Sequence, residues 1–416
     1  MDLRDKLRQF EKDLAPRQPN TVRSSHLDVD VCVEGKVVKN AKGTCFQTSS
    51  LFSATHQHGR IPFNLLHDSD PSIFPLVARD EALTGVDLRD AVFVDTETTG
   101  LAGGAGTVPF MIGMGYFEGD DFRVDQIFMR DFHEEPAALD VVADRLARAK
   151  ALVSYNGKAY DLPLLASRFT LARMPNPASK LPHLDLLFAV RRIWRKRLAD
   201  CSLSTVEEGV LDFRREDDVP GWAIPGLYFD YLRSRNGCAI APVFKHNKWD
   251  IVTLAALAGL MGRVYASPFD HLTHPFDLMG LGRAMAHLGR LDAAARCYRL
   301  ALNGSLPAEE KEEALQFYGL VLKRMGDWDR AVKVWDHMIQ SVSQKIHPCE
   351  ELAKYYEHQI RRHDLAIEVV RFALDWIDRM EQLRPTLVFT AKRKDLAYRL
   401  ARLERKMGKV RRSRDV

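Results

Sequence analysis

AVFVDTETTG, at residues 91–100, is the stretch of this 416-residue chain that decides its fold. Its first half is a short apolar run, typical of a buried β-strand, and the run ends in the acidic motif Asp95-Thr96-Glu97. Residues i and i+2 of a strand face the same side of a sheet, so Asp95 and Glu97 present both carboxylates together. Two like charges about 4 Å apart repel by about 4 kcal/mol at an effective dielectric of about 20.

Bound divalent cations are the usual compensation for such a pair, and oxygen ligands favour Mg²⁺ or Mn²⁺. For the D-x-E motif alone, two solvated acids at a strand end are the alternative interpretation. Other parts of the sequence are therefore needed to distinguish a metal site from two solvated acids.

Regular elements continue downstream of this first strand. Two further strands are predicted by PFMIGMGYFEG and FRVDQIFMRDF, which a hairpin-type connection at residues 118–121 joins, and another by ALVSYN. Helical periodicity is present in PAALDVVADRLARA, DLPLLASRF, LDLLFAVRRIWRKRL and DIVTLAALAGLMGRVY. Three consecutive strands followed by alternating strands and helices predict an α/β domain over residues 88–267, with a mixed sheet covered by helices.

The first 87 residues follow another pattern. They begin with MDLRDKLRQFEKDL, which predicts an amphipathic helix and does not resemble a signal peptide. The rest of residues 1–87 shows no sustained period, so we expect an irregular leader that packs on the larger domain.

From about Pro275 the strands stop and helix pairs repeat. Three segments superpose, LGRLDAAARCYRLAL, MGDWDRAVKVWDHMI and RRHDLAIEVVRFAL, with an alanine in equivalent places at Ala294, Ala331 and Ala366. The spacing of these alanines is close to the roughly 34-residue period of tetratricopeptide (TPR) hairpins. We therefore expect an all-α, TPR-like helical-repeat domain over residues 275–410, a candidate surface for a protein partner.

Composition and charge exclude several classes of protein. With 46% hydrophobic and 28% charged residues, the chain is not mainly disordered. Its most apolar stretch falls short of the roughly 20 residues of a membrane span. The six cysteines are scattered without metal-ligand spacing, which fits free thiols in a reducing compartment, so we expect a cytoplasmic protein without a membrane partner.

The formal net charge of +4 hides an asymmetry. Residues 391–416 contain eleven Lys or Arg and three acidic residues, a net charge of +8, so the remainder of the chain carries −4. Such a basic tail indicates contact with an anionic polymer or an acidic partner surface, unless it is a solvated helix end.

Two later segments carry acids that could join the first motif. YNGKAYD, at residues 155–161, follows a predicted strand and opens a helix, where Asp161 is either an N-cap or part of a site. KHNKWD, at residues 245–250, places His246 and Asp250 four residues apart, hence on one helical face. Taken alone, Asp250 could be an N-cap and His246 a core histidine. The ordered set D-x-E, N-x-x-x-Y-D and H-x-x-x-D is far less probable by chance and indicates a single acidic site.

This set of motifs resembles the DnaQ-like (DEDD) exonuclease superfamily of the ribonuclease H-like fold, and within it the YprB-type ribonuclease H-like domain. The resemblance covers residues 90–262 and is carried by VFVDTETTGLAGGAGT, LVSYNGKAYDLPLL, LPHLDLLFAVRRIWR, VPGWAIPGLYFDYL and HNKWDIVTL. It implies a mixed five-stranded sheet with flanking helices. It also implies a metal-dependent nuclease, a 3′-to-5′ exonuclease that hydrolyses nucleic-acid phosphodiesters by a two-metal mechanism and favours a single-stranded 3′ end of DNA or RNA.

The resemblance also assigns roles to the motif residues. It implies that Asp95, Glu97, Asp161 and Asp250 bind two Mg²⁺ or Mn²⁺ ions and that His246 is the general base. Histidine-type members of the superfamily usually have H-x-x-x-x-D at this place. Here a histidine stands at the shorter spacing of the tyrosine-type members.

The other candidate residues are substrate contacts. In the resembling family the loop after the first strand lies beside the substrate, which makes Thr98, Thr99 and Leu101 candidates. Asn156 either orients a ligand side chain or closes a turn.

A basic run interleaved with Trp194 contains Arg191 and Arg195, and it suits either a phosphate backbone with a stacked base or a solvated helix face. The competing function is a catalytically inactive nuclease fold that binds nucleic acid or recruits partners through the repeats.

Overall fold

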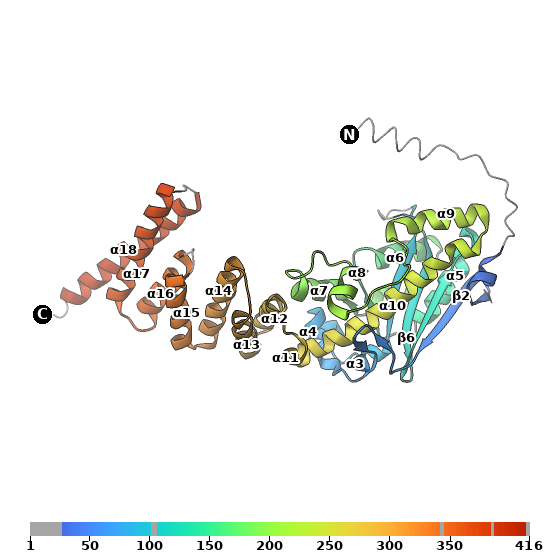
Figure 1. The fold of residues 1–416 in the computed structure, drawn as a ribbon, viewed down its shortest axis with the longest axis horizontal. Helices are drawn as coiled ribbons and strands as arrows, with labels where there is room; N and C mark the ends of the chain where they lie inside the picture. The colour runs from blue at the N-terminus through green and yellow to red at the C-terminus, as the bar shows by residue number, and fades with distance from the viewer. Residues whose placement is uncertain (1–26, 101–105, 342–344, 384–386, 413–416) are drawn as a thin grey trace, which may run out of the picture.

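The computed structural model describes residues 27–100, 106–341, 345–383 and 387–412. It consists of an α/β domain followed by an array of helices that extends away from it (Figure 1). The predicted N-terminal helix and Leu101 lie outside the described residues.

Within the described residues, the centre of the α/β domain is a seven-stranded mixed sheet of order β1-β2-β7-β6-β5-β8-β9. β5, β6 and β7 form an antiparallel meander, whereas β8 and β9 run parallel to β5. The sheet and its helices confirm the predicted ribonuclease H-like α/β fold. The strands are β1 (Lys36–Asn40), β2 (Gly43–Phe52), β5 (Ala91–Thr98), β6 (Pro109–Glu118), β7 (Asp121–Phe128), β8 (Ala151–Ser154) and β9 (His183–Asp185), with β3 (Gln57–His58) and β4 (Ile61–Pro62) as a separate pair.

The expected number of five strands is wrong, because the N-terminal segment adds β1 and β2 to the edge of the sheet. β2 pairs antiparallel with β7 from Phe46 opposite Phe128 to Phe52 opposite Phe122. The sequence of β2, GTCFQTSSLF, is largely small and polar, so no apolar alternation marks it as a strand. Pairing with β7, which supplies the backbone partners, stabilises this strand. The described part of the leader is therefore not irregular.

Alternate residues of β5 point to opposite faces of the sheet. Phe93 packs in a core with α10, whereas Val92 and Val94 pack with α5 and α6 on the other face. Asp95 and Glu97 follow Phe93 at intervals of two and so lie on the α10 face. The helices of this domain are α2 (Val29–Cys32), α3 (Asn64–His67), α4 (Phe74–Ala78), α5 (Glu135–Leu146), α6 (Asp161–Leu171), α7 (Leu186–Trp194), α8 (Leu203–Val206), α9 (Ile224–Ser234), α10 (Gly237–Ala266) and α11 (Pro268–His271), with a π-helical turn η6 (Glu207–Leu211) and a 3₁₀ turn η7 (Gly221–Ala223).

α10 lies across the sheet (Figure 1) and is the central helix of the domain. Its 30 residues are long and apolar enough to cross a membrane, but 83% of its most apolar window is buried inside the protein. Such burial is typical of a core helix.

The C-terminal region contains antiparallel helix pairs, as predicted. Ala294, Ala331 and Ala366 are fully buried, so the small side chains allow close approach of neighbouring helices. The turns of the first two pairs have left-handed glycines, Gly289 and Gly326, at φ of 75° and 77°. The helices are α12 (Pro275–His287), α13 (Leu291–Asn303), α14 (Ala308–Met325), α15 (Trp328–Ser341), α16 (Ile346–His358), α17 (His363–Leu383) and α18 (Leu387–Arg412).

The first helix of the array packs directly on the α/β domain. α12 contacts α7 so closely that a Cβ atom at Gly280 would lie 2.4 Å from the carbonyl oxygen of Ile193. Nearby, the Arg197 Nε atom donates to both carboxylate oxygens of Asp277, at 2.8 and 2.9 Å. One continuous apolar core therefore joins the two parts of the chain.

Many cations of the predicted basic tail are paired inside the protein. The tail lies mostly in α18, where Arg399, Arg402 and Lys406 all donate to the buried Glu357. Lys392 donates to Glu350. Less positive charge is therefore available to an outside partner than the sequence count indicates.

The expectation that the cysteines are free thiols is wrong for one pair. Cys32 and Cys238 form a disulfide with a Cα–Cα distance of 5.0 Å. It joins α2 to the first turn of α10, where a Cβ atom at Gly237 would lie 2.4 Å from the Cα atom of Val29. The two cysteines are 206 residues apart in sequence, so only the tertiary structure brings them together.

Candidate active site

The predicted acidic residues meet at the end of β5, under α10. Asp95 and Glu97 come from β5, and His246 and Asp250 come from α10; together they line a cavity of about 360 Å³. Asp161, the first residue of α6, accepts a hydrogen bond from the Thr96 hydroxyl. β5 thus carries two of the acids, Asp95 and Glu97, and the hydroxyl of Thr96 between them binds the third, Asp161.

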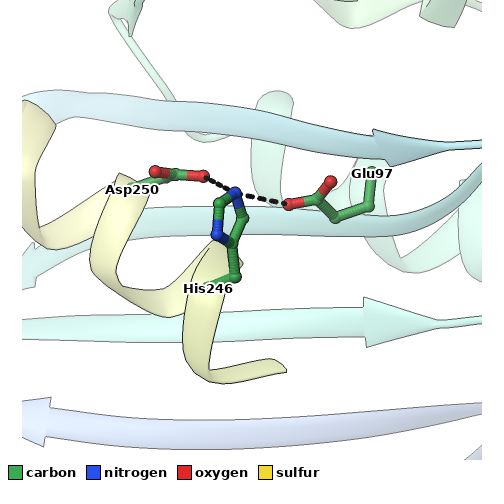
Figure 2. A group of neighbouring side chains, drawn as sticks. All are labelled: Glu97, His246 and Asp250. Atoms are coloured by element: carbon green, nitrogen blue, oxygen red, sulfur yellow. Dashed lines mark ion pairs between the residues drawn. The ribbon is translucent and has the colours of Figure 1, made fainter. Parts of the chain in front are cut away.

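His246 lies between two of the carboxylates. Its Nε2 atom is 3.4 Å from Asp250 Oδ2 and 4.0 Å from Glu97 Oε1, as Figure 2 shows. Its Nδ1 atom is 2.9 Å from Asp218 Oδ1. A carboxylate accepts but does not donate, so Nδ1 carries a proton and Nε2 is free to bind a cation or accept a proton.

The shorter H-x-x-x-D spacing is compatible with this arrangement. His246 and Asp250 are i and i+4 on α10, so both side chains project from one helical face toward Glu97. One ligand atom from each of the three residues lies within 4.8 Å of the others, close enough to share one metal ion.

Burial and nearby negative charge raise the pKa values of three of the acids, Asp95, Glu97 and Asp161. Burial raises the pKa of Asp95 well above its usual value, and the charges of Asp250, Asp161 and Glu97 raise it further. Burial and the charges of Asp250 and Asp161 do the same to the pKa of Glu97. Burial raises the pKa of Asp161 to about 6, against the opposing effect of the Thr96 hydrogen bond.

This charge arrangement fits a divalent cation. Asp95, Glu97 and Asp250 line one cavity, and Asp161 lies beside it on the Thr96 hydroxyl. Burial raises the pKa values of Asp95, Glu97 and Asp161, so the folded protein disfavours the ionised forms of these three carboxylates. Carboxylate oxygens are the ligands that Mg²⁺ and Mn²⁺ prefer, and an imidazole nitrogen is compatible with Mn²⁺. The residues present therefore fit a metal centre.

Arg215 is a functional candidate that the sequence analysis missed. Its guanidinium donates to Glu207 through Nε, at 2.8 Å, and through Nη2, at 2.6 Å, and Nη2 also donates to Asp250 Oδ1. Burial lowers the pKa of Arg215, but the carboxylates of Asp250 and Glu207 raise it by more, so that it lies above its usual range. In the sequence Arg215 lies in the charged run RREDD, which is typical of a solvated loop and carried no signal.

Asn247 was also missed. Its side chain is fully buried, and its Nδ2 atom donates to Asp95 Oδ2 at 3.0 Å. Its place beside His246 on α10 was visible in the sequence, but its direction toward Asp95 was not.

The predicted substrate contacts near β5 divide into two kinds. Thr98 lines the 360 Å³ cavity, and its hydroxyl donates to the carbonyl oxygen of Gly100 at 2.8 Å. The Thr99 hydroxyl accepts from the Val108 N–H at 3.0 Å and so closes the base of the loop. Thr98 remains a candidate contact, whereas the visible contact of Thr99 is structural.

Asn156 closes a turn. It is exposed, has a left-handed φ of 64°, and its N–H donates to Asp185 Oδ1 at 2.8 Å. Asp185 also caps α7 through the Leu187 N–H. The Asp185 carboxylate thereby fixes the turn that leads to Asp161.

The basic run on α7 does not form the predicted stacking site. Arg191 and Arg195 are exposed and do not line either cavity that the described residues form at the acidic cluster. Trp194 is only 1% exposed, because it lies in the core where α7 packs against α12. A base cannot stack on it.

A second cavity, of about 510 Å³, adjoins the first. It shares Asp95, His246 and Asp250 with the first cavity, and Gly221 borders both. The next residue, Trp222, is 75% exposed. The two cavities therefore meet at the acidic cluster, and an exposed tryptophan follows the glycine that borders both of them.

Two comparisons with known proteins agree with this geometry. A sequence profile of the RNase_H superfamily matches residues 92–262, the segment that carries all four candidate ligands. The chain is also similar to "Uncharacterized protein YprB" of Bacillus subtilis (strain 168), with 30% identity over 334 residues that cover 78% of each chain. The sheet order, the acidic cluster and these two similarities lead to one conclusion: the chain belongs to the RNase H superfamily.

Proposed function

We propose that the protein is a metal-dependent exonuclease that hydrolyses nucleic acid from a single-stranded 3′ end. The observation that carries the proposal is the convergence of Asp95, Glu97, Asp250 and His246 at one open cavity, with Asp161 bound to the Thr96 hydroxyl beside it. The RNase H-like fold supports nuclease activity in general. The direction of degradation, the identity of the metal and the roles of individual residues are the specific content of the proposal.

The four carboxylates would hold two Mg²⁺ or Mn²⁺ ions, which supply charge stabilisation at the scissile phosphate and a more acidic water. His246 Nε2, which faces Glu97 and Asp250, accepts the proton of the attacking water. The Asp218 carboxylate at Nδ1 holds the imidazole in place and stabilises its protonated form.

The depth of the carboxylates favours a single strand. Glu97, Asp161 and Asp250 are 8%, 5% and 8% exposed, so a phosphodiester must enter the cavity to reach them. We therefore expect an unpaired terminal nucleotide, and not a base-paired duplex, to enter this cavity of about 360 Å³. We propose that the exposed Trp222, which follows the cavity-lining Gly221 in the chain, stacks on a base of the same strand.

The test is cleavage of single-stranded and duplex DNA and RNA, labelled at the 3′ or the 5′ end, with Mn²⁺ and with EDTA. We expect stepwise loss of nucleotides from single-stranded 3′ ends, only with metal and not with Asp95→Asn. A wild-type protein that binds Mn²⁺ and nucleic acid but cleaves none of these substrates would instead support the competing function, an inactive binding or scaffold protein.

A further inference from the structure

We infer that the N-terminal segment, residues 36–62 with strands β1 to β4, helps to position the ligands of the metal site. Two buried hydrogen-bond chains, one from Thr48 on β2 and one from His58 on β3, position the carboxylates of Asp95 and Asp250. The inference rests on the proposed metal-binding function and adds positioning residues from a part of the chain outside the segment that matches the RNase_H profile.

The first chain runs from Thr48 to Asp95. The Thr48 hydroxyl donates to Gln126 Oε1 at 2.9 Å, and Gln126 Nε2 donates to Asn247 Oδ1 at 3.0 Å. Asn247 Nδ2 then donates to Asp95 Oδ2 at 3.0 Å. The first three side chains, Thr48, Gln126 and Asn247, are 5%, 3% and 0% exposed, so water does not replace these bonds. Each amide accepts through oxygen and donates through nitrogen, which gives the chain one direction.

The register of the sheet explains why this chain exists. Thr48, Gln126, Gly113 and Asp95 stand opposite one another on the adjacent strands β2, β7, β6 and β5. Gly113 has no side chain, and a Cβ atom there would lie 2.3 Å from Asn247 Oδ1. The carboxamide of Asn247 therefore occupies the space above Gly113 and bridges from Gln126 to Asp95.

The second chain runs from His58 to Asp250. His58 Nε2 lies 2.7 Å from the Thr253 hydroxyl, which donates to Glu207 Oε1. Because the single hydroxyl proton goes to Glu207, His58 Nε2 is the donor to Thr253. Burial lowers the pKa of His58 to about 3, which keeps the ring neutral. Glu207 binds Arg215, and Arg215 donates to Asp250 Oδ1.

Arg215 acts through other residues and not on a substrate. Each of its nitrogens donates to protein: Nε to Glu207, Nη2 to Glu207 and Asp250, and Nη1 to Asp218 Oδ2 at 3.2 Å. Asp218 in turn holds His246. Arg215 is thus a positioning residue for both Asp250 and His246.

Each of the two hydrogen-bond chains binds one carboxylate oxygen of a candidate ligand, and the other oxygen stays available to a metal ion. Oδ2 of Asp95 and Oδ1 of Asp250 are held from behind, which orients the remaining oxygens toward the cavity. Loss of such supporting hydrogen bonds typically weakens metal binding about 10- to 100-fold.

Three Thr→Val variants of the full chain test the inference, because each removes one hydroxyl with almost no change in volume. Thr48→Val breaks the first chain and Thr253→Val the second. Thr44→Val is the matched control: Thr44 also lies on β2, and its hydroxyl donates to the buried Glu134, at 3.2 Å, away from the site. The measurements are Mn²⁺ affinity by titration calorimetry and melting temperature without metal.

We expect Thr48→Val and Thr253→Val to bind Mn²⁺ about 10-fold more weakly than the wild type. Thr44→Val, and Thr48→Ser, which restores the hydroxyl, should bind it normally. Folded Thr48→Val and Thr253→Val proteins with wild-type Mn²⁺ affinity would overturn the inference.

Thr253→Val removes the hydroxyl that His58 Nε2 binds and one of the hydrogen bonds to the buried Glu207, which Arg215 still binds, and this loss could prevent folding. In that event Thr48→Val and Gly113→Ala, which displaces Asn247 from Asp95, decide the outcome by the same affinity measurement. A wild-type protein that binds no Mn²⁺ contradicts the proposed function itself. That result is distinct from intact binding in the variants, which contradicts only the role of the N-terminal segment.

Discussion

The Asp218 carboxylate lies 2.9 Å from the Nδ1 atom of His246, although the two residues are 28 positions apart in the chain. This contact assigns the proton of the imidazole to Nδ1 and turns Nε2 toward Glu97 and Asp250 (Figure 2). The contact leaves Nε2 to act either as a general base or as a metal ligand, and the two roles can be distinguished by measurement.

Substitution of His246 separates the two roles. If His246 is the general base, His246→Ala lowers kcat about 10²- to 10⁴-fold and leaves Mn²⁺ affinity unchanged. Asp218→Ala should show the same pattern with a smaller loss, because the imidazole stays but is no longer held. The measurements are single-turnover cleavage and titration calorimetry with Mn²⁺. A His246→Ala protein with clearly weakened Mn²⁺ binding would identify His246 as a ligand.

Removal of one candidate ligand should abolish cleavage and stabilise the metal-free fold. Asp95→Asn keeps the shape of the side chain and removes a charge that its buried acidic neighbours disfavour. We expect no cleavage, no rise of melting temperature on addition of Mn²⁺, and a higher melting temperature than the wild type in EDTA. Residual metal-dependent cleavage at the wild-type rate would exclude Asp95 from the reaction.

The metal-free protein should lose stability as the pH rises. Burial raises the pKa of Asp161 from 3.8 to about 6, so between these values the folded state binds more protons than the unfolded state. The free energy of unfolding then falls with pH, by on the order of 3 kcal/mol from Asp161 alone. Asp95 and Glu97 act in the same direction.

Urea unfolding in EDTA at a series of pH values measures this dependence, and Asp161→Asn is the control. The Asn variant should show a shallower fall of stability over this window. Addition of Mn²⁺ to the wild type should reverse the fall, since the cation favours the ionised carboxylates. A wild-type stability that rises over the same window would contradict the raised pKa values.

The α/β domain should depend on the first helix pair of the array. A chain that ends at Ser267 exposes the face of α7 on which α12 packs, and it removes the Asp277 partner of Arg197. We expect this fragment to melt at a markedly lower temperature than one that ends at Gly304, which retains α12 and α13. Equal melting temperatures of the two fragments would show that the core contact contributes little.

Trp222 should contribute to substrate binding and not to the chemical step. Trp222→Ala removes an exposed indole that follows the cavity-lining Gly221 in the chain, and loss of one stacking contact typically costs about 1–3 kcal/mol of binding. We expect weaker binding of single-stranded DNA or RNA, measured by fluorescence anisotropy in EDTA so that no cleavage occurs. Phe372→Ala, which removes an exposed aromatic side chain of α17, is the control and should bind normally.

The N-terminal segment could not be predicted from local pattern. β2 has a largely polar sequence, and its strand conformation depends on the backbone groups of β7, where the paired residues lie 70 or more positions away. The same holds for the Cys32–Cys238 disulfide and for the burial of Trp194 under the repeat helices. Each arises from a contact between distant segments that leaves no periodic signal in either segment.

By itself the sequence determined the α/β class, the helix pairs and the positions of the acidic motifs. These follow from short-range regularities: the two-residue period of β5 places Asp95 with Glu97, and the helical period of α10 places His246 with Asp250. Only the tertiary structure decided which side chains complete the site. Arg215, Asp218 and the chains from the N-terminal segment reach it through directed hydrogen bonds, whose geometry depends on how the elements pack and not on the spacing of residues along the chain.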